Sequence, residues 1–139
     1  MIEVVPPETN LSNAPCTFRV IDCTRDDDAS LDFTAPFSLS ASAAGTLRCF
    51  VIHFDTVFDL SSRPDGRRTS FSTSHLQPQT HWKQTSLYLK APIHLAKGDT
   101  VKGTIAFSRG IEYKRAYDMT VCFEPPNGGD PVTQMWRME

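Results

Sequence analysis

The sequence predicts an all-β fold, an antiparallel β-barrel-like domain of about eight short strands. Three observations indicate this class. Apolar and polar residues alternate with period two, turn sequences separate the alternating runs, and no segment sustains a helical period. Ten prolines spread over 139 residues also disfavour long helices. Many short strands divided by turns are typical of barrels and sandwiches.

The strands are expected in the following order. The first lies at 16–23, and the second at 37–43, where three serines alternate with apolar residues. The third, 46–60, is longer, and His53 and Asp55 interrupt its second apolar face near the end. Further strands are expected at 68–73, 82–89, 100–107, 117–123 and 133–138, with turns at 63–66, 97–99, 108–110 and 125–129.

One domain is the simplest organisation for a chain of this length, which can bury roughly two thirds of its unfolded surface. Residues 1–15 contain three prolines and are expected to form an N-terminal arm leading into the fold. Residues 16–139 would then form the β-barrel. The abrupt opening on IEVV suggests a fragment of a longer protein.

Composition narrows the classes of function. A net charge of -2 gives no basic footprint, so direct nucleic-acid binding is not expected. No apolar run is long enough for a membrane span, and the first residues do not resemble a signal peptide, so an intracellular protein is expected. The four cysteines lack C-x-x-C spacing and are expected to be reduced, buried thiols: Cys16, Cys23, Cys49 and Cys122.

Known catalytic motifs are scarce. Gly-rich phosphate loops, the G-x-S-x-G elbow and H-E-x-x-H are absent from the sequence. His53 and Asp55 have the spacing of two ligands of an iron facial triad, with His81 or His94 as the distant histidine. Such a triplet arises often by chance, so a polar pair on the wet face of a strand is the favoured interpretation, and no metal site is predicted.

Two charged runs have simple interpretations. The acidic run 26–28 could meet an arginine-rich partner, but it is more typical of a solvated loop. The run 67–70, RRTS, is similar to a phosphorylation site, yet it begins a predicted strand, where a phosphate would disturb pairing.

The remaining candidate site residues lie in the stretch 80–82, THW. Thr80 is expected in a loop, and Trp82 as a large residue at the core or rim where a strand begins. His81 could titrate near neutral pH and act as an acid, a base or an orienting group. On residue type alone, a structural role for the pair is favoured over a catalytic one.

The surrounding residues change this interpretation, because FSTSHLQPQTHWKQTSLYL at 71–89 resembles the segment of protein arginine N-methyltransferases that contains their THW loop. LDFTAPFSL at 31–39, FDTVF at 54–58 and KGDTVKGTI at 97–105 are similar to further strands and turns of that family. EVVPPE near the start resembles the segment that follows the family's dimerisation arm. The resemblance covers nearly the whole chain.

The resemblance implies the C-terminal β-barrel of an S-adenosylmethionine-dependent enzyme, serving substrate binding. The cofactor-binding Rossmann-like domain and the dimerisation arm are expected to lie outside this chain, which would bind no cofactor and be inactive alone. His81 would pair with an acidic residue of that domain or relay a proton, Trp82 would pack behind its glutamate loop, and Thr80 would shape the loop.

The resemblance also implies partners: arginine-rich (Arg-Gly type) protein substrates, the missing cofactor-binding domain and, for the intact enzyme, a second copy in a homodimer. Location in the cytoplasm or nucleus is expected. The alternative is a stand-alone, non-catalytic module that partners an active methyltransferase.

Overall fold

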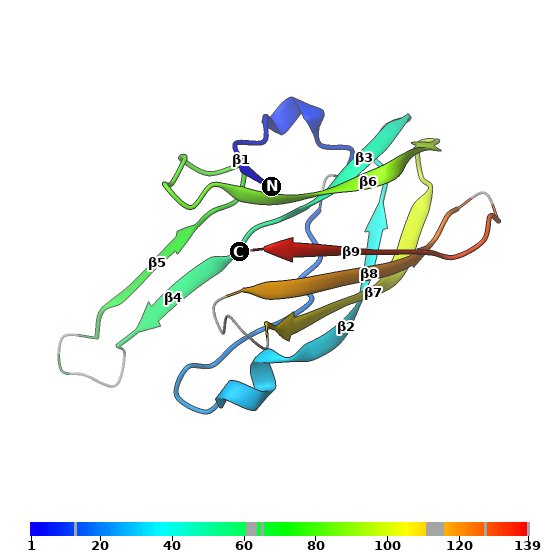
Figure 1. Cartoon of the computed structure of the whole chain (residues 1–139). Coiled ribbons are helices and arrows are strands. Elements are labelled where there is room, and N and C mark those ends of the chain that lie inside the picture. The colour runs from blue at the N-terminus through cyan, green and yellow to red at the C-terminus, as the bar shows by residue number, and fades with distance from the viewer. Residues whose placement is uncertain (13, 61–63, 65, 111–115, 127, 139) are drawn as a thin grey trace. The chain divides into compact units, whose positions relative to one another are not determined.

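A computed structural model describes residues 1–12, 14–60, 64, 66–110, 116–126 and 128–138 (Figure 1). The described residues form nine strands and two short 3-10 helices. In chain order these are β1 (Ile2–Glu3), η1 (Pro7–Thr9), η2 (Asp28–Leu31), β2 (Phe33–Ser40), β3 (Gly45–Ile52), β4 (Asp55–Asp59), β5 (Arg68–Ser72), β6 (Gln84–Leu95), β7 (Thr100–Arg109), β8 (Tyr117–Glu124) and β9 (Val132–Met138).

The all-β class is confirmed. The strands form a three-stranded sheet in the order β1-β6-β3, a four-stranded sheet in the order β2-β7-β8-β9, and a two-stranded sheet of β4 and β5. Pairing is antiparallel for β1 with β6, β4 with β5, and throughout the four-stranded sheet. The strands that the structure describes do not join into one closed barrel.

Strand positions agree with the sequence pattern over most of the chain. The strands predicted at 68–73, 100–107, 117–123 and 133–138 are confirmed to within two residues at either end as β5, β7, β8 and β9. The single strand predicted over 46–60 is divided into β3 and β4, because the chain leaves the extended ladder at His53 and Phe54. The strand predicted from 82 begins at Gln84, and the one predicted at 37–43 runs instead over 33–40.

The strand predicted at 16–23 is wrong, since these residues form no strand. Phe18 stacks on Phe107 and Phe33, with ring centroids 5.7 Å and 6.2 Å apart. The next residue, Arg19, also lies over Phe33, 5.3 Å from the ring centroid. Two successive side chains therefore contact one neighbour, which strand alternation does not allow. In a strand with this alternation Val20 would lie on the buried face, but it is 76% exposed.

The chain divides into two compact units. One unit comprises residues 11–47 and 91–139, and it contains the four-stranded sheet. Its core is formed by apolar residues of the sheet and of the segments that connect its strands. The buried apolar residues described in this unit are Ala35, Ala41, Leu95, Val101, Ile105, Ala116, Met119, Val121 and Phe123. Within the same unit, Arg109 at the end of β7 pairs with Asp32, Nη2 to Oδ2 at 3.0 Å.

A glycine allows close packing within that sheet. Gly103 on β7 stands opposite Phe123 on β8 and Phe37 on β2. A Cβ at this position would collide with the backbone carbonyl of Cys122 and lie 2.8 Å from the Cα of Phe123. The residue at 103 must therefore lack a side chain for β7 and β8 to approach as they do.

The other unit comprises residues 1–10 and 48–90. It contains β1, the β4–β5 ribbon and the parts of β3 and β6 within these bounds. Its buried apolar residues are Phe50, Leu87 and Leu89, and three polar residues, Thr73, Gln84 and Ser86, are equally buried. A two-stranded ribbon is marginal by itself, so the buried polar residues matter for holding β4 and β5 in place.

Candidate functional site

The THW stretch forms a tight turn that ends on an unusual backbone conformation. The N–H of Lys83 donates to the carbonyl of Thr80 at 3.2 Å, closing the turn. Lys83 has a φ of 56°, the single positive value for a residue other than glycine in the part of the chain described. Lysine adopts this left-handed region at a cost of about 1 kcal/mol or more. The turn lets β6 begin directly afterwards, at Gln84.

The turn presents His81 and Trp82 together. The two rings are 3.8 Å apart between centroids and tilted by 32°. Both residues are exposed, and Trp82 retains 47% of its accessible surface. Its position therefore depends on the rings that contact it. The sequence prediction of a loop before the strand is met, but Trp82 belongs to the turn and not to β6.

Two phenylalanines form the support for Trp82. Phe71 on β5 stacks on the indole with centroids 5.2 Å apart, and Phe54 meets it edge-on at 6.0 Å. Phe54 and Phe71 also meet edge-to-face at 6.0 Å. Offset and edge-on pairs of this kind each contribute about 0.5–1.5 kcal/mol beyond buried area. We refer to Phe54, Phe71 and Trp82 as the aromatic cluster.

The buried side chains of Thr73 and Gln84 form hydrogen bonds to the backbone of several segments. Gln84 Nε2 donates to the carbonyl of Thr73 at 2.6 Å, and Gln84 Oε1 accepts from the N–H of Val5 at 2.9 Å. Thr73 Oγ1 accepts from the N–H of Phe54 at 3.0 Å and donates to the carbonyl of Phe54 at 3.1 Å. Four separate segments of the chain are therefore joined through two buried side chains.

Thr80 supplies a further polar group. Its hydroxyl oxygen is buried, and within the described residues it has no hydrogen-bond partner. A buried hydroxyl without a partner costs about 1–3 kcal/mol. The Thr80 side chain is therefore the polar group of the turn that the described part of the chain leaves unsatisfied.

His53 and Asp55 were considered above as two ligands of an iron site. They are separated by the break between β3 and β4, and the ring of His53 instead meets His75 edge-on at 6.5 Å. His75 contacts Asn10 through Nε2 at 3.1 Å. Burial, and secondarily the nearby His53, lowers the pKa of His75. Among the residues that the structure describes, no three His, Cys, Asp or Glu side chains come together in a way that could hold a metal ion.

A second polar cluster lies beside the start of β6. The Tyr88 hydroxyl donates to Glu3 Oε1 at 2.8 Å. The neighbouring Ser86 and Tyr88 side chains lower the pKa of Glu3, while burial raises the pKa of the Cys49 thiol. A thiol with a raised pKa is a weak nucleophile at neutral pH. The bond between Glu3 and Tyr88 joins β1 to β6.

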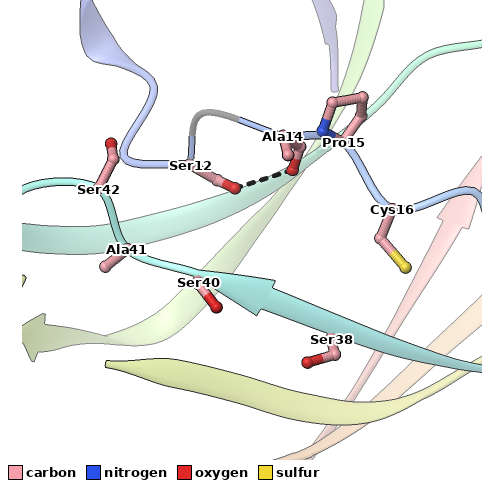
Figure 2. A pocket seen from close by; sticks show the side chains of 8 residues that line it. All are labelled: Ser12, Ala14, Pro15, Cys16, Ser38, Ser40, Ala41 and Ser42. Atoms are coloured by element: carbon pink, nitrogen blue, oxygen red, sulfur yellow. Dashed lines mark hydrogen bonds between the residues drawn. The ribbon is translucent and has the colours of Figure 1, made fainter. Parts of the chain in front are cut away.

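A surface hollow lies in the other unit (Figure 2). It has a volume of about 420 Å³, and Figure 2 shows four serines around it. The lining residues are Ser12, Ala14, Pro15, Cys16, Ser38, Ser40, Ala41 and Ser42. None of these carries the carboxylate that holds ribose hydroxyls in dinucleotide sites, nor do they form a Gly-rich phosphate loop. The lining therefore has neither of these two features of a nucleotide site.

The remaining sequence candidates have structural surroundings. In the acidic run 26–28, the Asp27 carboxylate accepts from the N–H of Ser30 at 3.0 Å and caps η2, while Asp28 begins that helix. The end of the run 67–70 lies within β5, where Ser70 is paired with Val57 of β4. All four cysteines are free, but the expectation that they are buried is wrong: Cys23 is exposed, and Cys16, Cys49 and Cys122 are half-buried. No helix among the described residues is both long and apolar enough to cross a membrane.

Phe54, Phe71, Thr73 and Gln84 were not assigned roles from the sequence. All four fall inside the stretches whose resemblance is described above, but a resemblance marks positions and not contacts. The period-two pattern around Phe71 and Thr73 indicates a strand, and it contains no signal for the partners of either residue.

Comparisons with known proteins agree with the fold. The family model described as the arginine methyltransferase oligomerization subdomain matches residues 1–126. The ribosomal protein arginine N-methyltransferase rmt3 of Schizosaccharomyces pombe is 33% identical over 122 residues, which cover 84% of this chain and 22% of that protein. Protein arginine N-methyltransferase 1 of Chlamydomonas reinhardtii is 28% identical, covering 99% of this chain and 39% of that protein.

Solved structures match over the whole chain. The structure described as the Trypanosoma brucei PRMT1 enzyme–prozyme heterotetrameric complex with AdoHcy has a TM-score of 0.86 and 26% identity, over 43% of that chain. Arabidopsis thaliana protein arginine methyltransferase 10 has a TM-score of 0.85 and 19% identity, and it supports the fold alone. The chain spans less than half the length of these relatives. It therefore belongs to the protein arginine methyltransferase family and corresponds to the family's C-terminal, oligomerization subdomain.

Proposed function

We propose that this chain forms one wall of the substrate cleft of an S-adenosylmethionine-dependent protein arginine N-methyltransferase, with Thr80, His81 and Trp82 facing the cleft. One observation carries the proposal. His81 and Trp82 are in ring contact and exposed, on a turn that ends in a left-handed lysine and rests on a buried polar frame. A strained, exposed turn on a rigid support is typical of a functional position.

Each residue of the turn has a role suited to its chemistry. The exposed imidazole of His81 can pair with a carboxylate across the cleft and hold or pass a proton at a ring nitrogen. Trp82 offers a flat apolar face against which a loop of the cofactor-binding region packs. Thr80, whose hydroxyl oxygen is buried, shapes the turn, and its carbonyl accepts the bond from Lys83 that closes it.

The region that binds the methyl donor lies outside this chain in our proposal. Bound there, the donor supplies the methyl group, and the substrate is an arginine-rich protein of the Arg-Gly type. The walls of the cleft act by orientation, which can lower a barrier by several kcal/mol when two reactants are held in line. By itself the chain is proposed to be inactive. The intact enzyme would be a homodimer of the cytoplasm or nucleus.

A chimera tests the proposal. This chain replaces the aligned region of the S. pombe relative, and transfer of labelled methyl groups from S-adenosylmethionine to an Arg-Gly-rich peptide is measured. We expect activity from the chimera and none from the chain alone. His81→Ala and Trp82→Ala should each lower kcat by about tenfold or more, the scale of a lost proton-transfer or orienting group.

Lys97→Ala, at an exposed turn of the other unit, is the matched control and should leave kcat unchanged. A folded chimera that binds the methyl donor but transfers no methyl group would contradict the proposal. So would one that is active but insensitive to both turn substitutions.

A second candidate is a non-catalytic module that modulates an active subunit. The T. brucei structure similar to this chain is described as an enzyme–prozyme heterotetrameric complex, and this description supports the second candidate. Addition of the chain to an active arginine methyltransferase distinguishes the two. A saturable change in rate favours the modulator, whereas an unchanged rate excludes it for that enzyme.

A further inference from the structure

Gln84 is buried, yet it stands only two residues after an exposed tryptophan. It retains 3% of its accessible surface, whereas Trp82 retains 47%. The intervening Lys83 adopts the left-handed conformation, which turns the chain sharply between them. With a single residue between the two, the place where Gln84 is anchored limits where Trp82 and His81 can stand.

The anchor of Gln84 is made of hydrogen bonds and not only of packing. Its amide uses both ends, the nitrogen toward Thr73 at 2.6 Å and the oxygen toward Val5 at 2.9 Å. These two bonds fix the orientation of the amide, because a reversed amide would place its NH2 group against the Val5 N–H and its oxygen against the Thr73 carbonyl. An apolar side chain of the same size could fill the space but could not select this orientation.

Thr73, which accepts the hydrogen bond from Gln84, is also bonded to Phe54, one of the two phenylalanines that contact Trp82. Thr73 holds Phe54 by three hydrogen bonds: the two made by its hydroxyl and a backbone bond from Thr73 N–H to the Phe54 carbonyl at 2.9 Å. Phe54 in turn contacts the indole of Trp82. Gln84 therefore acts on Trp82 along two routes, through Lys83 in the sequence and through Thr73 and Phe54 in space.

We propose that Gln84 is a positioning residue for the THW turn, whose side-chain amide fixes His81 and Trp82 relative to the aromatic cluster. The proposal rests on the proposed function for its consequence in catalysis. Gln84 touches neither His81 nor a reacting group in this role; it acts through Thr73 and the turn.

Fluorine NMR of the 139-residue chain labelled with 5-fluorotryptophan tests the proposal. The chain contains two tryptophans, Trp82 and Trp136, and Trp136 lies on β9 in the other unit. Trp136 therefore reports on the general state of the fold. Gln84→Met, which keeps the size and removes both hydrogen bonds, should shift or broaden the Trp82 resonance and leave that of Trp136 in place.

The matched control is Gln79→Ala, at an exposed position just before the turn, which should move neither resonance. An unmoved Trp82 resonance in Gln84→Met would overturn the proposal. Equal disturbance of both resonances would also overturn it, since Gln84 would then support the fold as a whole. If Gln84→Met does not fold, Gln84→Glu is judged by the same criteria; it keeps the size and an acceptor for Val5, but it loses the donor to Thr73 and adds a carboxylate beside the Thr73 carbonyl.

The chimera separates this inference from the proposed function. Gln84→Met should lower its kcat by about tenfold or more, the scale expected for a misplaced group, with the KM for the methyl donor unchanged. An active chimera that is insensitive to Gln84→Met would overturn the positioning role and leave the proposed function intact. The NMR measurement needs no methyl transfer, so it tests the positioning role even if the chimera is inactive.

Discussion

Replacement of Thr73 by valine tests the buried frame directly. Thr73 is 1% exposed, and valine has nearly the same shape, so the change removes the hydroxyl and leaves the packing. The carbonyl of Phe54 keeps its bond from Thr73 N–H, but the N–H of Phe54 loses the oxygen it donates to at 3.0 Å. The substitution therefore leaves one backbone donor without this partner.

The expected loss follows from that one donor. A buried donor without a partner costs about 1–3 kcal/mol, and this bond is only partly buried, so the lower part of the range applies. The added methyl group recovers a fraction of that. We expect the free energy of unfolding to fall by about 1 kcal/mol, which for a chain of this size lowers Tm by roughly 3–5 °C.

Urea unfolding followed by circular dichroism measures this change. Thr69→Val is the matched control, since Thr69 lies exposed on β5 opposite Phe58, and surface changes usually stay within about 0.5 kcal/mol. Equal free energies of unfolding for Thr73→Val and Thr69→Val would refute the reasoning, because the hydroxyl would then contribute nothing through Phe54.

Three further predictions concern other positions. Lys83→Gly should raise the free energy of unfolding by about 0.5–1 kcal/mol, since glycine adopts the left-handed conformation without strain; a decrease in urea unfolding would contradict this. Gly103→Ala should lower it by about 1–3 kcal/mol, because its Cβ would collide with the carbonyl of Cys122, and an unchanged Tm would show that β7 can move aside. Burial and His53 lower the pKa of His75, so the unfolded chain takes up the proton more readily and stability falls as pH drops below the usual value of about 6.5. His75→Gln should reduce the loss of stability between pH 7.5 and 5, and an identical loss in both proteins would rule out His75 as its source.

The sequence predicts the strands of this protein where one face of a sheet is buried. β7 and β8 follow the alternating pattern closely, with Val101, Ile105, Met119 and Val121 all buried. The segment 16–23 shows the same alternation and is not a strand; Phe18 instead stacks on Phe33, in the next strand, and on Phe107, which is distant in the sequence. The local alternation of apolar and polar residues contains no information about such ring stacking.

The candidate site, too, can be predicted from the sequence only in part. His81 and Trp82 are identifiable from the sequence through the resemblance of their surroundings. The conformation of Lys83 is not, since lysine has no preference for a left-handed backbone and nothing near it signals one. The partners of Gln84 are also hidden, because hydrogen bonds to backbone groups of Val5 and Thr73 depend on where the chain passes and not on the side chains there.

The bond between Gln84 and Val5 also has a consequence for the order of folding. It joins residues 79 positions apart, and Ile2 and Glu3 pair with Thr85 and Gln84 over nearly the same separation. Contacts of such long range form only after a large loop has closed, so they are slow and come late. During synthesis the first five residues must wait for β6 to emerge from the ribosome. The bond between Val5 and Gln84 would therefore be among the last contacts of its unit to form.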